Sequence, residues 1–310
     1  MKFLFMVGTF KKVDLLKKIK RLKREKNAIV LAHNYQRPEI YEIADFIGDS
    51  LGLCVEASKV NADIIVFCGV NFMAESAVIL NPGKKVLVPH LDAGCAMADM
   101  VDCGDLEELK KKNPDAAVVT YVNSTAEIKA VSDVCCTSSN AVEVVRSIPQ
   151  KKIIFVPDKN LAAYVAGRVP EKTIIPWEGY CPAHHFVTRE ILDNVRDKSP
   201  GAKIIAHPES RKEVLEEADY VASTSAMIDC AGKDSAEEFF VLTECGMTER
   251  LKRELPEKKF TGLCNLCFDM KKNTIESVCE ALEKEKEVVE VDDRIAKEAL
   301  KAFERMFSLT

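Results

Sequence analysis

Three cysteines recur at an equal spacing along the chain. Cys95, Cys181 and Cys267 are separated by 86 and 86 residues, and each follows a late strand or loop in its segment. Thiolates bind iron and zinc, and three protein ligands leave one coordination position open, as in a catalytic metal centre. No histidine shares this spacing, and catalytic zinc usually takes nitrogen ligands, so the set favours an iron-sulfur cluster. A zinc site and buried thiols without metal remain the alternatives.

The other nine of the twelve cysteines have no partners at this spacing. Cys135 and Cys136 are adjacent, so in a strand at most one could face the site, and we interpret both as structural thiols. In the CNLC motif we assign Cys267 as the ligand and Cys264 as a bystander that can form a disulfide with it when metal is lost. Six more are interpreted as small buried side chains: Cys54, Cys68, Cys103, Cys230, Cys245 and Cys279.

Polar residues at the ends of apolar runs keep the same spacing. They form two columns, and within each column successive members are 88 and then 86 residues apart. The first column is His33, Tyr121 and His207, and the second is Tyr35, Asn123 and Glu209. The columns lie two residues apart, so within a strand both members of a pair point to one side. We expect acid-base candidates in His33, His207 and Glu209, and hydrogen-bond donors in Tyr35, Tyr121 and Asn123. The alternative for each is a polar tip that caps the core.

Further polar residues fit the same frame. Ser50, Ser138 and Thr224 each precede a predicted helix, where a hydroxyl is either an N-cap or part of an anion-binding cradle. Three copies favour a substrate with several carboxylate or phosphate groups. His184, three residues after Cys181, is a candidate base or ligand. The aspartates of a fourth column are interpreted as structural, at a turn or cap: Asp45, Asp133 and Asp219.

Short runs rich in valine and isoleucine must position these side chains. They alternate with helical patterns and lie at 28–33, 62–70, 84–89, 116–122, 151–157, 172–176, 202–207, 218–223 and 238–243. This alternation predicts an α/β fold with buried parallel strands. A helix-turn-strand unit begins each of three repeats of about 86 to 88 residues.

The repeats predict three αβα domains around a pseudo-threefold axis. Their ranges are 1–100, 101–187 and 188–310, the first with an N-terminal helix and the last with C-terminal helices. Ligands of parallel sheets bind beyond the carboxyl ends of the strands, where the polar columns lie. One shared site is therefore expected, and three independent sites are the alternative.

Composition narrows the class of protein. The 310 residues carry 44 basic and 49 acidic side chains and a formal charge of −5, with no basic face for nucleic acid. No apolar stretch approaches the roughly 18 residues of a membrane span. The cysteines are too scattered for a secreted disulfide scaffold. We expect a cytoplasmic protein that acts on small molecules, with no nucleic-acid or membrane partner.

Several strings of residues together resemble the quinolinate synthase A family over nearly the whole chain. They include LAHNYQRPEIYEIADFIGDSLGL, YVNSTAE, TSSNAVEVV, CPAHHF, HPES, ADYVASTS and CFDMKKNT. The resemblance implies three αβα domains about a pseudo-threefold axis. It also implies condensation of iminoaspartate with dihydroxyacetone phosphate, with loss of phosphate and two waters, which gives quinolinate for de novo NAD biosynthesis.

The resemblance also assigns roles. Cys95, Cys181 and Cys267 would hold one four-iron, four-sulfur (4Fe-4S) cluster per chain, whose open iron acts as a Lewis acid. Glu209 matches the family's base, with Tyr35, His33, His184 and His207 beside it. Tyr121 and Asn123 match residues that orient the intermediate, and Ser50, Ser138 and Thr224 match hydroxyls that hold substrate oxygens. A transient contact with the enzyme that produces iminoaspartate is expected.

Two other classes of function stay open from the residues alone. A hydro-lyase with an open cluster iron would need the same three thiolates but a hydroxy-acid substrate. A non-catalytic iron or redox sensor would explain the number of cysteines. Product analysis separates the first from a synthase, and substitution of Glu209 separates the second from both enzymes.

Overall fold

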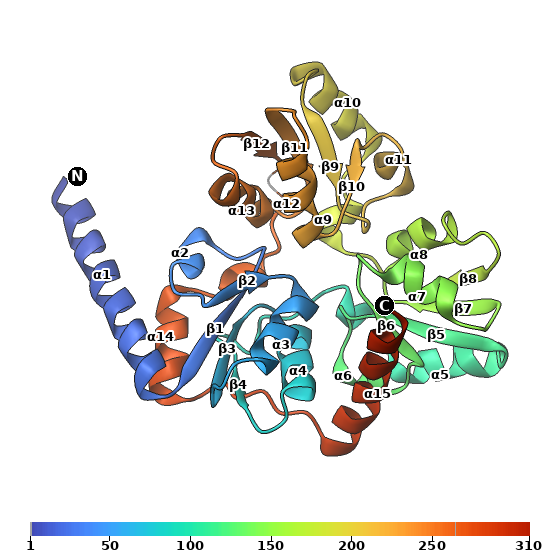
Figure 1. Ribbon diagram of the computed structural model, residues 1–310, viewed down its shortest axis with the longest axis horizontal. Coiled ribbons are helices and arrows are strands. Elements are labelled where there is room, and N and C mark those ends of the chain that lie inside the picture. The colour runs from blue at the N-terminus through green and yellow to red at the C-terminus, as the bar shows by residue number, and fades with distance from the viewer. Residues whose placement is uncertain (1, 264) are drawn as a thin grey trace. The chain divides into compact units, whose positions relative to one another are not determined.

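The protein contains three parallel sheets of one design. The computed structural model describes the backbone of residues 2–263 and 265–310 and the side chains of residues 13–263 and 265–310. Each sheet has four strands in the same order, β2-β1-β3-β4, β6-β5-β7-β8 and β10-β9-β11-β12 (Figure 1). The repeated order and the parallel pairing confirm the predicted α/β class with three similar αβα repeats.

The first compact unit comprises residues 1–94 and 268–291. Its strands are β1 (Ala28–His33), β2 (Phe46–Gly48), β3 (Ile64–Cys68) and β4 (Lys85–Leu87). Its helices are α1 (Lys2–Glu25), α2 (Pro38–Tyr41), α3 (Ser50–Ser58), α4 (Asn71–Leu80), the short η2 (Met270–Lys272) and α14 (Ile275–Lys284). Every residue of β1 and β3 is buried, as expected for parallel strands covered on both faces.

The second compact unit comprises residues 95–267 and 292–310 and contains two sheets. Its strands are β5 (Ala116–Tyr121), β6 (Val134–Cys136), β7 (Lys152–Val156), β8 (Thr173–Pro176), β9 (Lys203–Ala206), β10 (Tyr220–Val221), β11 (Glu238–Leu242) and β12 (Lys259–Gly262). The helices around the β5–β8 sheet are η1 (Ala98–Met100), α5 (Cys103–Lys112), α6 (Ala126–Ala130), α7 (Ala141–Ser147), α8 (Lys159–Ala166) and α15 (Asp293–Leu309). Those around the β9–β12 sheet are α9 (Pro182–His185), α10 (Arg189–Lys198), α11 (Lys212–Leu215), α12 (Thr224–Lys233) and α13 (Cys245–Glu254). No helix in the described part of the chain is long and apolar enough to span a bilayer.

The two C-terminal helices pack on different sheets. Helix α14 packs against α1 and β3 in the first unit, where it buries Val278 and Leu282. Helix α15 packs against α6 and β6 in the second unit, where it buries Phe303 and Met306. The sequence-based range 188–310 grouped both helices with the third repeat. Their apolar faces instead cover the first and second sheets.

Three strands have no counterpart among the predicted runs. They are β2, β6 and β12, and each is an edge strand of three or four residues. An edge strand pairs on one side only, so it needs neither length nor a continuous apolar run. The nine predicted runs correspond to the other nine strands.

The aspartate column is structural, as the sequence predicts, but its members accept hydrogen bonds from strand amides instead of capping helices. In each repeat the carboxylate accepts a hydrogen bond from a backbone N–H of the first strand: Asp45 from Val30 at 2.7 Å, Asp133 from Val118 at 2.7 Å, and Asp219 from Ile204 at 2.8 Å. These bonds attach the start of the edge strand to its central neighbour. Asp219 is also paired with Arg196 and Lys203.

Replacement of Asp219 by alanine should lower the free energy of unfolding by about 1–3 kcal/mol at pH 7, because a strand amide loses a charged acceptor. Burial raises the pKa of Asp219, but the Ile204 amide, Lys203 and Arg196 together lower it. Because the folded-state pKa is depressed, this contribution is present above the unfolded pKa of about 3.9 and is lost as the pH falls through the folded value. Urea unfolding at pH 7 and pH 3 measures the difference. The control Asp193→Ala, on the exposed face of α10, should change stability little at either pH.

Candidate metal centre and active site

A buried carboxylate gathers side chains from both sheets of the second unit. Glu209 follows β9 and is 2% exposed. Its Oε1 accepts a hydrogen bond from the Tyr121 hydroxyl at 2.7 Å and a longer one from Asn123 Nδ2 at 3.4 Å. Tyr121 is the last residue of β5, so the carboxyl ends of β5 and β9 meet at Glu209. Tyr121 and Asn123, which precede Glu209 by 88 and 86 residues in the sequence, are therefore its neighbours in the structure.

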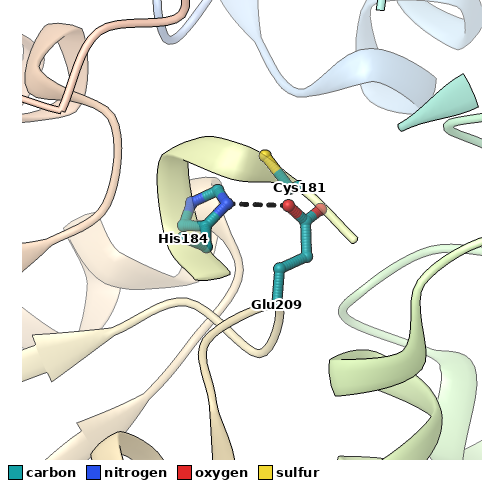
Figure 2. Close-up of side chains that lie close together, drawn as sticks. All are labelled: Cys181, His184 and Glu209. Carbon is teal, nitrogen blue, oxygen red and sulfur yellow. Dashed lines mark ion pairs between the residues drawn. The ribbon is translucent and has the colours of Figure 1, made fainter. Parts of the chain in front are cut away.

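Two histidines complete the surroundings of this carboxylate. His184 Nδ1 lies 2.8 Å from Glu209 Oε2 (Figure 2). His207 Nδ1 lies 3.8 Å from Glu209 Oε1. The two imidazole rings stack with their centroids 4.7 Å apart. His184 Nε2 lies 2.7 Å from the Thr243 hydroxyl, so both of its ring nitrogens have protein partners. His184 is thereby held in one orientation beside Glu209.

The charge of Glu209 is set by opposing effects. Burial raises its pKa, but the nearby His207 and His184, and hydrogen bonds from His184 and Tyr121, lower it to about 2. Glu209 is therefore an ionised carboxylate at neutral pH. Asp158, which is fully buried, has the opposite shift, because burial and the Glu209 carboxylate raise the pKa of Asp158 well above its usual value.

All three equally spaced cysteines belong to the second unit. Each is partly buried, and none of the cysteines in the described part of the chain forms a disulfide. Burial raises the pKa of Cys95 to about 12, and the Cys267 and Glu209 charges add to the effect. Burial, Glu209 and the thiols of Cys95 and Cys267 raise the pKa of Cys181. The three thiols and Glu209 are therefore close enough to affect one another's pKa. The predicted bystander Cys264 lies outside the described residues.

One group of side chains has the spacing of metal ligands. Among the described residues, Cys181 Sγ, a ring nitrogen of His184 and a carboxylate oxygen of Glu209 all lie within 4.8 Å of one another (Figure 2). Cys181 immediately precedes α9, and that short helix brings His184 back to the same side. Sulfur, nitrogen and oxygen donors at this spacing are able to bind a transition-metal ion or zinc.

The predicted hydroxyl residues lie at or just before helix starts, and none of them is the N-cap residue. Ser50 and Thr224 are the first residues of α3 and α12, and the N-cap residues are Asp49 and Ser223. Ser138 lies two residues before the Asn140 cap of α7. The N-cap interpretation was wrong because the residue that caps, with extended backbone, lies one position earlier in α3 and α12. Their anion-binding role stays a prediction.

Three predicted site residues belong to the first unit. His33 is the last residue of β1 and is buried, with its ring in edge contact with Tyr35 at a centroid distance of 4.8 Å. The Tyr35 backbone N–H donates to His33 Nδ1 at 3.2 Å. Ser50 begins α3 in the same unit. Their participation in a site with Glu209 stays a prediction.

Sequence reasoning missed the residues that support the site. Asp158 Oδ2 accepts the backbone N–H of Cys181 at 3.1 Å, and Glu244 Oε1 accepts that of Cys267 at 3.2 Å. Both carboxylates are fully buried and also cap helices, α8 and α13. Each acid precedes its cysteine by 23 residues and the two lie 86 apart, a signal that the repeat comparison could have found. Asn160, also missed, donates to the Glu209 backbone carbonyl at 2.9 Å.

Comparison with known proteins identifies the family. Residues 17–308 match the family model described as quinolinate synthetase A protein. The chain is 53% identical over 298 residues to a quinolinate synthase of Alkaliphilus metalliredigens, which covers 96% of this chain and 98% of that protein. It is 53% identical over 298 residues to one of Methanosarcina barkeri, with the same coverage, and 50% identical over 296 residues to one of Thermodesulfovibrio yellowstonii, with 95% and 98% covered. The chain therefore belongs to the quinolinate synthase A family of enzymes.

Proposed function

We propose that the chain condenses iminoaspartate with dihydroxyacetone phosphate, with loss of phosphate and two waters, to form quinolinate for de novo NAD biosynthesis. Membership of the family supports the reaction, since the relatives are named for this product. The observation that carries the proposal is Glu209, a buried and ionised carboxylate that Tyr121 and His184 hold beside Cys181. Because this carboxylate is ionised and fixed in position, it is able to accept the protons that dehydration and ring closure release.

The three equally spaced cysteines suit a cluster better than a single ion. The only group in the described part of the chain whose ligand atoms all lie within 4.8 Å contains Cys181 without Cys95 or Cys267. The three thiols are thus not all within 4.8 Å of one another, and a four-iron cluster, which takes each thiolate on a different iron, suits such a wider spacing. When bound, the cluster would supply an open iron as a Lewis acid for a substrate oxygen or nitrogen.

The chain's own residues would orient the substrate and move protons. Glu209 accepts protons, and the hydrogen bonds from Tyr121 and His184 fix the direction of its two oxygens. Asn123 Oδ1 is buried and has no hydrogen-bond partner among the described residues. A buried acceptor without a partner is costly, so it suits an N–H donor of the substrate. Ser138 and Thr224, before or at helix starts, would hold carboxylate or phosphate oxygens.

Product analysis tests this proposal. Protein purified without oxygen is incubated with dihydroxyacetone phosphate and with iminoaspartate generated from oxaloacetate and ammonium. We expect quinolinate by mass spectrometry, and none when dihydroxyacetone replaces its phosphate ester. Turnover of a hydroxy acid by dehydration, without quinolinate, would instead indicate a hydro-lyase. A transient contact with the enzyme that produces iminoaspartate is part of the proposal, because the imine hydrolyses in water.

Replacement of Tyr121 by phenylalanine should lower turnover roughly 10- to 100-fold, because a hydrogen bond to a charged group contributes about 1.5–3 kcal/mol. The iron content should stay unchanged, since Tyr121 is not a thiol ligand. The matched control is Tyr164→Phe on α8, whose ring lies under the Arg168 guanidinium. Equal rates for wild type and Tyr121→Phe would contradict the role assigned to this hydroxyl.

A further inference from the structure

We propose that the cluster-free chain has a second metal site, which binds one divalent zinc-class ion through Cys181, His184 and Glu209. This site shares only Cys181 with the proposed cluster. The ion and the cluster therefore cannot bind at the same time. This mutual exclusion rests on the proposed function, in which Cys181 is a cluster ligand. Binding of the ion itself depends only on the three side chains.

The spacing of the donor atoms suits one small ion. His184 Nδ1 and Glu209 Oε2 are 2.8 Å apart, and Cys181 Sγ lies within 4.8 Å of the other two donor atoms. Zinc bonds of about 2.0 to 2.3 Å in a tetrahedral arrangement need ligand atoms roughly 3 to 4 Å apart. Shifts below an ångström would therefore suffice. One sulfur, one nitrogen and one oxygen leave a fourth position for water.

Each of the three ligands is held by a further buried group. His184 Nε2 lies 2.7 Å from the Thr243 hydroxyl, which can accept the Nε2 N–H, so Nδ1 is the ring nitrogen that faces Glu209 and would bind the ion. Glu209 Oε1 accepts from the Tyr121 hydroxyl, and Oε2 faces His184. The Cys181 amide donates to Asp158 Oδ2 at 3.1 Å. Such outer contacts orient the ligands of metal sites, and their loss typically costs about 10- to 100-fold in affinity.

The three repeats have different residues near their equally spaced cysteines, and only Cys181 has a histidine three residues after it. Three residues after Cys181 stands His184, whereas Ala98 and Met270 follow Cys95 and Cys267 at the same distance. Of the column Tyr35, Asn123 and Glu209, only Glu209 supplies a carboxylate. The second repeat thus adds a nitrogen and the third repeat an oxygen to a single thiol. Neither of the other two cysteines has this set.

The chemistry of binding balances without a further reactant. The Cys181 thiol gives up its proton to solvent as the sulfur binds the ion. The proton between His184 Nδ1 and Glu209 Oε2 leaves as these two atoms bind the same cation. Because a divalent ion neutralises the added negative charge, burial of the three ligands favours the bound state.

Cobalt and zinc titration of the full-length, iron-free chain tests the proposal. Co²⁺ should bind one per chain with the charge-transfer absorbance of a single thiolate and the strong visible bands of tetrahedral coordination, and Zn²⁺ should displace it. We expect His184→Ala to weaken cobalt binding by at least about 100-fold and Thr243→Val by about 10- to 100-fold. Cys95→Ala should leave cobalt affinity within about threefold. Circular dichroism confirms that each variant is folded.

Reconstitution with iron and sulfide gives the opposite order of effects. Cys95→Ala should fail to form the brown cluster, whereas His184→Ala should form it. One equivalent of Zn²⁺ added first should block cluster formation in the wild type and not in His184→Ala. Absorbance of three thiolates on cobalt, equal affinity of wild type and His184→Ala, or absence of binding would overturn the site. Cobalt binding as expected without any cluster would instead remove the proposed function and leave this site standing.

Discussion

Replacement of Glu209 by glutamine is expected to lower the rate of quinolinate formation by about 10²- to 10⁴-fold while the chain keeps its iron. Glutamine has nearly the same shape and can still accept the Tyr121 hydroxyl, so the packing of this buried position is preserved. It has no carboxylate to accept a proton. General-base catalysis contributes about 10²- to 10⁴-fold, and we expect the rate to fall by about that factor.

The measurement is quinolinate formation per cluster, with iron and sulfide assayed on the same samples. The matched control is Glu217→Gln, an exposed glutamate of the third repeat that pairs with Arg189, and it should behave as the wild type. Turnover of Glu209→Gln within a few-fold of the wild type would contradict the assigned base. A chain that senses iron without catalysis would keep its function in this variant.

Each of the three variants Cys95→Ser, Cys181→Ser and Cys267→Ser should lose the brown colour and nearly all bound iron and sulfide. Iron-sulfur clusters are held by thiolates, and serine is a poor ligand for soft iron. We expect about four irons per chain in anaerobic wild-type protein. With one of only three protein ligands lost, the cluster would be open at two irons and would dissociate.

Two other cysteines provide controls for this set. Cys103 begins α5 and Cys230 lies in α12, both partly buried and both away from the 86-residue spacing. Cys103→Ser and Cys230→Ser should retain the iron content of the wild type. Colour that survives all three ligand substitutions, or that disappears equally in the controls, would show that the equally spaced cysteines are not the cluster ligands.

The spacing of residues in the sequence predicted the parts of the fold that repeat. The columns at intervals of 86 and 88 correspond to three sheets with one strand order, and they brought Tyr121 and Asn123 to Glu209. Side chains at strand ends are predictable in this way because parallel strands end at one edge of the sheet. The aspartate column was found from the same repeat spacing, although its members directly precede the edge strands.

Contacts that depend on packing or on backbone groups left no comparable pattern. Helix α14 packs on the first unit and α15 on the second through their apolar faces. The sequence of an amphipathic helix shows that one face is buried but not which sheet covers that face. Thr243 reaches His184 across 59 residues from the end of β11. Asp158 and Glu244 act on backbone amides, so they resemble ordinary helix caps in the sequence.

The central claim is that three cysteines hold a cluster with one iron open to the substrate beside Glu209. The most direct test is the Mössbauer spectrum of anaerobic wild-type protein enriched in ⁵⁷Fe, recorded with and without quinolinate. We predict about four irons per chain, of which about a quarter of the signal shifts when quinolinate binds. An unchanged spectrum with quinolinate bound, or iron that is not part of a cluster, would contradict the account.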